Sequence, residues 1–176
     1  MRDRFIKLIY REIENCKSGE TGRIVVQMNS LGDPEIIAYL YKASQAGVKI
    51  DCIVRGICCL RPGLEGISDN IKVVSIVGRY LEHSRIFYFY NKGKEEVYIG
   101  SADWMPRNLD RRVEAITAVE DPEIAKELQE IMGILLSDNR QAWDLQPDGK
   151  YIQRRSTDNF PELACHKILM ETVANN

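Results

Sequence analysis

The feature that most constrains the fold is a strand–helix–strand pattern in residues 24–54. The apolar residues 24–28 predict a buried strand, and the turn after them ends in Asp33 and Pro34, which suit the start of a helix. The helix is expected to run to about residue 46, where Gly47 closes it, and residues 48–54 form a second apolar strand. Two strands joined through a helix usually pair in parallel, so the pattern predicts an α/β fold.

Further elements follow on both sides of this unit. Apolar residues at helical spacing predict helices at residues 2–17, 121–137 and within 157–173, the last mainly from Pro161 to Val173. Apolar and aromatic runs predict strands at residues 71–77, 86–90, 95–100 and 113–119. Residues 139–156 are expected to be irregular. We therefore expect a single domain of residues 1–176, with a mixed, mainly parallel sheet flanked by helices.

The net charge of the chain is slightly negative, whereas one part of the chain is rich in arginine. A formal net charge of -2 argues against a general nucleic-acid binder. Seven arginines nevertheless gather in the middle third of the chain, and such local positive charge can bind an anion. These arginines are Arg55, Arg61, Arg79, Arg85, Arg107, Arg111 and Arg112.

The cysteines indicate a reducing compartment. There are five of them, without CxxC spacing, and no secretory signal segment is evident, so we expect free thiols in the cytoplasm. Adjacent Cys58 and Cys59 are poorly suited to one tetrahedral zinc site and are expected to pack as small apolar residues. No apolar run has the length that a membrane span needs, although peripheral association with a membrane is left open.

A hairpin near the middle of the chain brings candidate functional residues together. The strands at 86–90 and 95–100 are joined by turn residues 91–94, so the ends of the hairpin should meet. We expect His83 and Arg85 to lie near residues 101–103, with Arg107, Arg111 and Arg112 facing the same place. An imidazole beside arginines suits phosphate chemistry. One guanidinium can donate to two oxygens of the same phosphate, and the unperturbed pKa of histidine lies near neutral pH.

Arg55 is a second candidate, at the carboxyl end of the strand 48–54 and directly before Gly56. Open α/β sheets bind ligands at this end of their strands, and the loop of residues 56–70 is expected to be functional. The residues alone leave ordinary structural roles open. His83 could be a hydrogen-bonded residue at a strand start, and the later arginines could pair with Asp103, Asp110 and Glu114. His166 is expected to be structural.

Three long blocks resemble one known family: Met28–Gly63, Ser75–Gly93 and Tyr98–Glu114. They are similar to the C-terminal catalytic domain of the polyphosphate kinase family. This family transfers the terminal phosphate of ATP reversibly to inorganic polyphosphate, through a phosphohistidine and with magnesium. The resemblance implies a phospholipase-D-like fold, in which His83-Ser84-Arg85 stands in place of His-x-Lys and Gly100–Asp103 in place of Gly-Ser-x-Asn.

The resemblance also implies roles for individual residues. His83 is the catalytic candidate, and Arg55, His83, Arg85, Arg111 and Arg112 are the candidates for binding ATP and polyphosphate. The phosphorylated histidine and the ligands of Mg²⁺ are expected upstream, so no metal ligand is expected in this chain, which would be a fragment of a longer enzyme. That enzyme is expected to bind ATP, ADP and polyphosphate and to form a homo-oligomer. Nucleic acid is not expected among its binding partners.

Two other functions remain open at this stage. One is a catalytically silent phosphate- or nucleotide-binding module that acts through a partner. The other is a homodimeric phospholipase-D-like phosphodiesterase with His83 as nucleophile, which would need two copies of the histidine motif.

Overall fold

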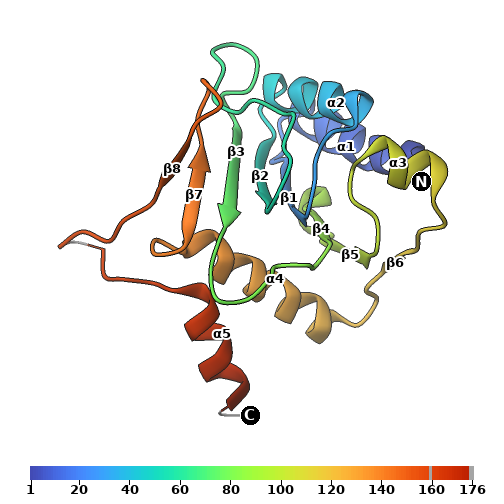
Figure 1. Ribbon diagram of the computed structural model, residues 1–176. Helices are drawn as coiled ribbons and strands as arrows, with labels where there is room; N and C mark the ends of the chain where they lie inside the picture. The colour runs from blue at the N-terminus through green and yellow to red at the C-terminus, as the bar shows by residue number, and fades with distance from the viewer. Residues whose placement is uncertain (159, 175–176) are drawn as a thin grey trace.

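The computed structural model describes residues 1–158 and 160–174, and it shows one central sheet between two layers of helices (Figure 1). The order of the eight strands is β6-β5-β4-β1-β2-β3-β7-β8. The strands are β1 Arg23–Met28, β2 Lys49–Val54, β3 Ile71–Ile76, β4 Ile86–Phe89, β5 Glu96–Gly100, β6 Ile116–Ala118, β7 Ala142–Leu145 and β8 Tyr151–Gln153. The helices are α1 Arg2–Lys17, α2 Pro34–Gln45, the short 3₁₀ turn η1 Asn91–Gly93, α3 Pro106–Arg111, α4 Pro122–Ser137 and α5 Cys165–Ala174.

The sheet is mixed, as expected, but parallel pairing does not predominate. The strand–helix–strand unit pairs β1 with β2 in parallel, and β2 pairs with β3 in the same way. The other five pairings between the described strands are antiparallel. The reason is that hairpins on both sides of the parallel centre extend the sheet: β4 and β5 on one side, β7 and β8 on the other.

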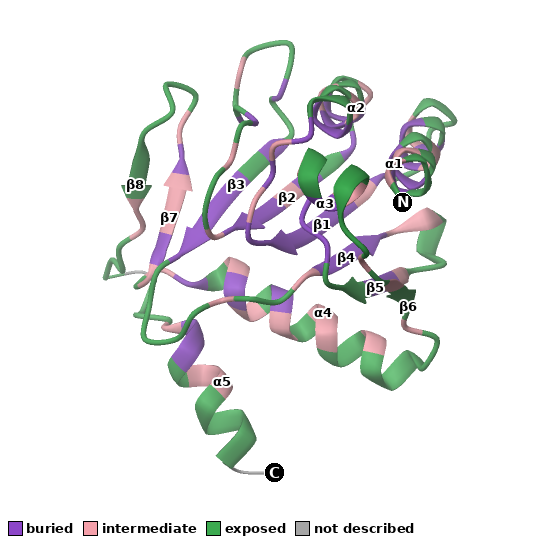
Figure 2. Cartoon of the chain, turned by 45° about the vertical axis from the view of Figure 1, so that its right-hand side comes forward, coloured by how far each residue is buried: buried purple, intermediate pink, exposed green. Residues whose placement is uncertain are grey.

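Both faces of the central strands are buried, because helices cover each face (Figure 2). Ile24, Val26 and Phe87 belong to the core cluster under α1 and α2. Val25 and Tyr88, which alternate with them along the same strands, belong to the cluster over α4. This alternation explains why β1 reads in the sequence as an almost continuous apolar run.

The start of α2 forms as the sequence predicts. The Asp33 side chain accepts a hydrogen bond of 3.0 Å from the backbone N–H of Ile36, and Pro34 occupies the first turn. Arg2 donates to the other carboxylate oxygen of Asp33 from Nε and Nη2, at 3.0 and 2.9 Å. The end of β1 therefore passes into a helix whose first turn is fixed to α1.

Three predictions about the second half of the chain were wrong in detail. Residues 139–156, expected to be irregular, contain β7 and β8, and the Pro147-Asp148-Gly149 turn between them is a hairpin signal that was overlooked. The expected strand 113–119 is shorter, because only Ile116–Ala118 pair with β5, as β6. The last helix begins at Cys165, not within 157–164, and Asn159 lies outside the described residues.

An aromatic cluster joins α1, β4 and the segment after β5. Trp104 is fully buried, and its ring centroid lies 5.2 Å from that of Phe5 and 5.5 Å from that of Phe87. Phe5 and Phe87 are themselves 4.7 Å apart. This packing fixes the backbone directly after Asp103.

We expect Trp104→Ala to lower the free energy of unfolding by about 3–5 kcal/mol, since it leaves a large cavity in a packed core. Trp104→Phe should cost clearly less, because it keeps an aromatic ring and because Nε1 of Trp104 has no hydrogen-bond partner among the described residues. Denaturant unfolding followed by circular dichroism measures both, with the fully exposed Val113→Ala as the control. A loss below about 1 kcal/mol for Trp104→Ala would contradict this packing.

Candidate functional site

Four strand ends meet at one edge of the sheet. Strands β1 and β2 are parallel, and β5 runs in their direction because it is antiparallel to β4, which is antiparallel to β1. The carboxyl ends of β1, β2 and β5 therefore lie at the same edge as the amino end of β4. Asn29, Arg55 and Ser101 directly follow the first three strands, and Arg85 directly precedes the fourth.

Backbone hydrogen bonds tie the loops at this edge to one another. The N–H of Leu31 donates to the carbonyl of Ile57 at 2.8 Å, and the N–H of Cys59 donates back to the carbonyl of Leu31 at 2.8 Å. The N–H groups of Gly32 and Asp33 both donate to the carbonyl of Trp104, at 2.8 and 2.9 Å. The segments after β1, β2 and β5 thus form one connected platform.

The buried carboxylate of Asp103 is the centre of the polar contacts on this platform. Its Oδ1 accepts hydrogen bonds from the backbone N–H of Asn29 at 2.9 Å and from Nδ2 of Asn29 at 3.3 Å. The same oxygen accepts from Nε of Arg85 at 3.2 Å. Asp103 is only 3% exposed, so its negative charge is compensated by these donors rather than by water.

Arg85 connects Asp103 to the exposed His83. Nη1 of Arg85 donates to Nδ1 of His83 at 2.8 Å and to the backbone carbonyl of His83 at 2.8 Å. Since a guanidinium can only donate, Nδ1 is the acceptor in this contact, and Nε2 of the neutral ring carries the proton. Among the described residues, Nη2 of Arg85 has no hydrogen-bond partner, so it can bind an anion.

Arg55 is joined to the same network through Asn29. Nε of Arg55 donates to Oδ1 of Asn29 at 3.0 Å, and the backbone carbonyl of Arg55 accepts from the hydroxyl of Ser75 at 3.0 Å. Its two Nη groups make no hydrogen bond within the described part of the chain. Gly56 lets the loop pass close to β1, since an added Cβ would lie only 3.0 Å from the carbonyl oxygen of Asn29.

Ser101 and Glu114 form a second polar pair beside Arg85. The Ser101 hydroxyl donates to Glu114, and Nδ2 of Asn108 donates to the other carboxylate oxygen at 2.6 Å. The hydrogen bond from Ser101 lowers the pKa of Glu114, and the charges of Arg112 and Arg85 act in the same direction. Glu114 therefore remains an anion that faces two of the predicted phosphate-binding arginines.

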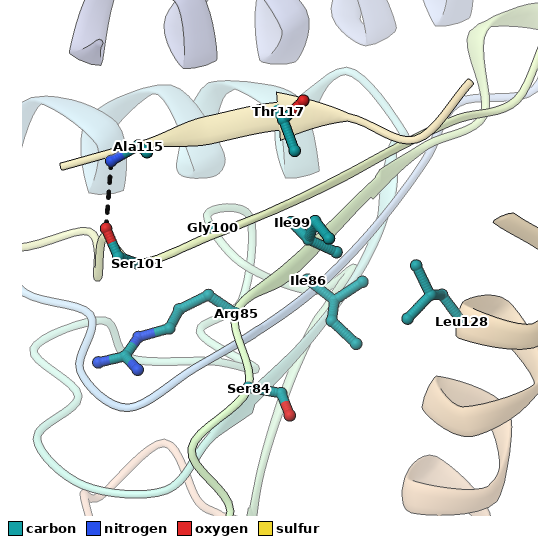
Figure 3. Close-up of a pocket in the computed structure, with 9 residues that line it drawn as sticks. All are labelled: Ser84, Arg85, Ile86, Ile99, Gly100, Ser101, Ala115, Thr117 and Leu128. Atoms are coloured by element: carbon teal, nitrogen blue, oxygen red, sulfur yellow. Dashed lines mark hydrogen bonds between the residues drawn. The ribbon is translucent and has the colours of Figure 1, made fainter. Parts of the chain in front are cut away.

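An apolar cavity of about 500 Å³ adjoins this pair (Figure 3). Arg85 and Ser101 lie at its polar side, whereas Ile86, Ile99 and Leu128 supply apolar walls from β4, β5 and α4. Figure 3 shows the hydroxyl of Ser101 directed to the backbone N–H of Ala115, at 3.1 Å. This edge therefore has one charged side and one apolar side.

The structure brings some of the predicted residues together and leaves others apart. His83 and Arg85 lie beside Asp103 as expected, and Arg55 joins them through Asn29. Arg107 and Arg111 lie exposed on α3 and make no hydrogen bond to this network within the described residues. The hydrogen bond from Arg2 of α1, at 2.6 Å, lowers the pKa of Asp110, and the charge of Arg111 acts in the same direction.

The thiols are free as predicted, but the expectation that both Cys58 and Cys59 pack as small apolar residues was wrong for Cys59, which is exposed. All five thiols are free, and burial raises the pKa of Cys58 to about 11, which favours the neutral thiol.

The sequence interpretation missed Asn29, which was assigned only to a turn. Its position directly after a buried parallel strand, equivalent to that of Arg55 after the next strand, was the available signal.

This edge does not suit a magnesium ion. The one carboxylate at its centre, Asp103, already receives three hydrogen bonds on Oδ1, one of them from the guanidinium of Arg85. No group of three histidine, cysteine, aspartate or glutamate side chains with metal-ligand placement occurs in residues 1–158 and 160–174.

Among the described helices, none combines the length and the apolar character needed to cross a bilayer.

Known proteins resemble this chain along almost its whole length. The family model described as Polyphosphate kinase C-terminal domain 2 matches residues 1–164. The chain is 67% identical to a polyphosphate kinase of Synechocystis sp. over 88% of its length, and 61% identical to one of Thermosynechococcus vestitus over 97%. It spans only 21% and 23% of those two proteins, respectively.

The fold has similar relatives among solved structures. The crystal structure of polyphosphate kinase from Porphyromonas gingivalis matches with a TM-score of 0.95 at 43% identity, over 99% of this chain and 27% of that one. A phospholipase D family member from Salmonella typhimurium matches with a TM-score of 0.55 at 17% identity, over 77% of this chain and 88% of that one, which shows the shared phospholipase-D-like fold alone. Taken together, the family match and the identities show that this chain belongs to the polyphosphate kinase C-terminal domain family.

Proposed function

We propose that this chain forms part of the active site of a polyphosphate kinase, which transfers the terminal phosphate of ATP reversibly to inorganic polyphosphate. The observation that carries the proposal is the continuous chain of hydrogen bonds from Arg55 through Asn29, Asp103 and Arg85 to His83. It joins two arginines to an exposed imidazole, and both Nη groups of Arg55 and Nη2 of Arg85 have no partner among the described residues. The high identity to proteins named polyphosphate kinase supports the assignment.

The arginines bind the phosphates in this proposal. Arg55 and Arg85 are each fixed at Nε by an acceptor of the protein, which leaves both Nη groups of Arg55 and Nη2 of Arg85 to bind phosphate in this proposal. A guanidinium that is held in this way loses little conformational freedom when it binds phosphate oxygens. Arg112, beside Glu114, and Arg111, on α3, extend the positive charge along the polyphosphate.

His83 acts on the phosphoryl group that is transferred. Because Nδ1 accepts from Arg85, the proton lies on Nε2, which is 3.5 Å from Nη1 of Arg85, and in this proposal Nε2–H donates to a phosphate oxygen. This hydrogen bond strengthens as negative charge develops on the leaving oxygen. Proton transfer from the ring would require the imidazolium, whose Nδ1 carries a proton and no longer accepts from Arg85. Positioning and charge stabilisation are the main tasks in phosphoryl transfer, since the protein forms few covalent bonds in it.

The remaining parts of the reaction lie outside this chain in the proposal. The phosphohistidine and the ligands of Mg²⁺ belong to upstream domains, and Mg²⁺ neutralises phosphate charge there. We further propose that the whole enzyme forms a homo-oligomer in the cytoplasm, where its thiols remain reduced. The domain of residues 1–176 is then one piece of that longer protein.

We expect Arg55→Ala to lower the apparent affinity for polyphosphate by roughly ten- to a hundredfold, because a charge-assisted hydrogen bond is worth about 1.5–3 kcal/mol. The measurement is the polyphosphate dependence of ADP phosphorylation by a polyphosphate kinase that contains this chain. Lys49→Ala is the matched control, since it removes one positive charge from the opposite end of the same strand, β2. Equal effects of the two variants would contradict an anion site at Arg55.

His83 should affect turnover more than binding. We expect His83→Ala to lower kcat by roughly a hundredfold or more with a smaller change in KM, because removing a donor that stabilises developing charge costs about 10²- to 10³-fold. His83→Gln keeps a hydrogen-bond donor without a titrating proton, so partial rescue assigns electrostatic stabilisation and no rescue assigns proton transfer. Wild-type kcat in His83→Ala would remove His83 from the reaction and leave it as a structural residue at the start of a strand.

A further inference from the structure

The segment that carries His83 has little support from the backbone. Residues 77–85 connect β3 to β4 without helix or strand structure. Among the described residues, the N–H groups of residues 78–84 make a single hydrogen bond, from Tyr80 to Nδ1 of His166 at 3.3 Å. The position of this loop therefore depends on the side chains that hold it.

His166 uses both ring nitrogens to hold the loop. It lies in the first turn of α5 and is only 4% exposed. Because a backbone N–H can only donate, Nδ1 is an acceptor for Tyr80, and the proton is on Nε2. Nε2 then donates to Oε1 of Glu82 at 2.7 Å. One imidazole thus holds two positions of the loop that are separated by a single residue.

Glu82 passes this support on to the sheet. Its second oxygen, Oε2, accepts a hydrogen bond of 3.0 Å from Nε2 of Gln27, a buried residue of β1. Gln27 lies two positions before Asn29, which belongs to the phosphate-binding network. Glu82 itself directly precedes His83, so α5, β1 and the imidazole of the active site are mechanically connected.

Alternate residues of the loop contact α5. An added Cβ on Gly78 would lie only 2.6 Å from Nδ1 of His166, so the backbone passes directly against the ring. The ring centroid of Tyr80 lies 5.5 Å from that of His166, and the Tyr80 hydroxyl donates to the sulfur of Met170 at 3.2 Å. With Glu82, these contacts fix every second residue from 78 to 82 against the helix.

We infer that His166 is a positioning residue of the kinase reaction, which holds the loop of residues 77–85 so that Nε2 of His83 meets the transferred phosphate. This inference rests on the proposed function. Its physical reason is that a displacement of about 1 Å at a reacting group can cost roughly a hundredfold in rate. The role originally expected for His166, packing within the fold, would affect stability but not the geometry of His83.

Three substitutions separate the two roles. His166→Gln places an amide N–H near the position of Nε2 and keeps a donor for Glu82. His166→Phe keeps the volume of the ring and loses both hydrogen bonds. Lys167→Ala changes the next residue of α5, whose exposed ammonium pairs only with Glu171, at 3.9 Å, among the described residues.

In a polyphosphate kinase that contains this chain, we expect His166→Phe to lower kcat roughly tenfold or more while KM for polyphosphate changes less, since Arg55 and Arg85 remain in place. His166→Gln should regain most of the lost turnover, and Lys167→Ala should match the wild type. Thermal unfolding identifies any loss of folded protein. If His166→Phe does not fold, Glu82→Ala tests the same connection from the loop side and should lower kcat in the same way.

A second readout uses the fact that the chain has only two histidines. In the His166 variants, the remaining imidazole resonances in a ¹⁵N-labelled chain belong to His83. Tripolyphosphate should shift them in the wild type and in His166→Gln, and the shift should be much weaker in His166→Phe. An equal shift in folded His166→Phe, together with kcat within twofold of the wild type, would overturn the inference. No shift of His83 in the wild-type chain would overturn the proposed function itself.

Discussion

The site depends on one buried charge, the carboxylate of Asp103, which connects three strand ends. Its Oδ1 accepts from both nitrogens of Asn29 after β1 and from Arg85 before β4. A buried ion pair contributes little net stability, yet leaving one partner alone costs about 3–5 kcal/mol. Asp103 therefore fixes where Arg85 must lie, and Arg85 in turn fixes the ring of His83. The directions of the donors, more than the strength of the pair, determine the geometry of the site.

The same arrangement keeps positive charge available for a ligand. Arg55 and Arg85 each use Nε for the protein, and the backbone platform of the loops after β1, β2 and β5 holds their main chains. The platform rests on Trp104, whose ring is packed between α1 and β4. A flexible, highly charged polymer such as polyphosphate is bound best by donors whose positions are fixed beforehand. The packing of Trp104 and the Nε contacts of Arg55 and Arg85 fix the guanidinium groups in this way.

Local sequence patterns predicted the parts of the fold that local physics decides. The unit β1-α2-β2 followed from apolar runs and the Asp33-Pro34 start of the helix, and the hairpin placed Arg85 beside Asp103. The resemblance in three sequence blocks indicated the family correctly. What the sequence could not show was tertiary: that Asn29 bridges Arg55 to Asp103, that Asp110 pairs with Arg2 of α1, and that His166 reaches Glu82 across 84 residues. Such contacts depend on how distant segments meet, which no local pattern records.

The most direct test of the central claim is a crystal structure of the chain with tripolyphosphate bound. The account predicts a phosphate group within hydrogen-bond distance of Nη atoms of both Arg55 and Arg85 and of Nε2 of His83, with Asp103 still bonded to Asn29 and Arg85. Tripolyphosphate bound only elsewhere, such as at Arg140 and Arg155 near the end of the sheet, would contradict it. So would a bound phosphate that contacts Arg55 while the Asp103–Arg85 contact is broken.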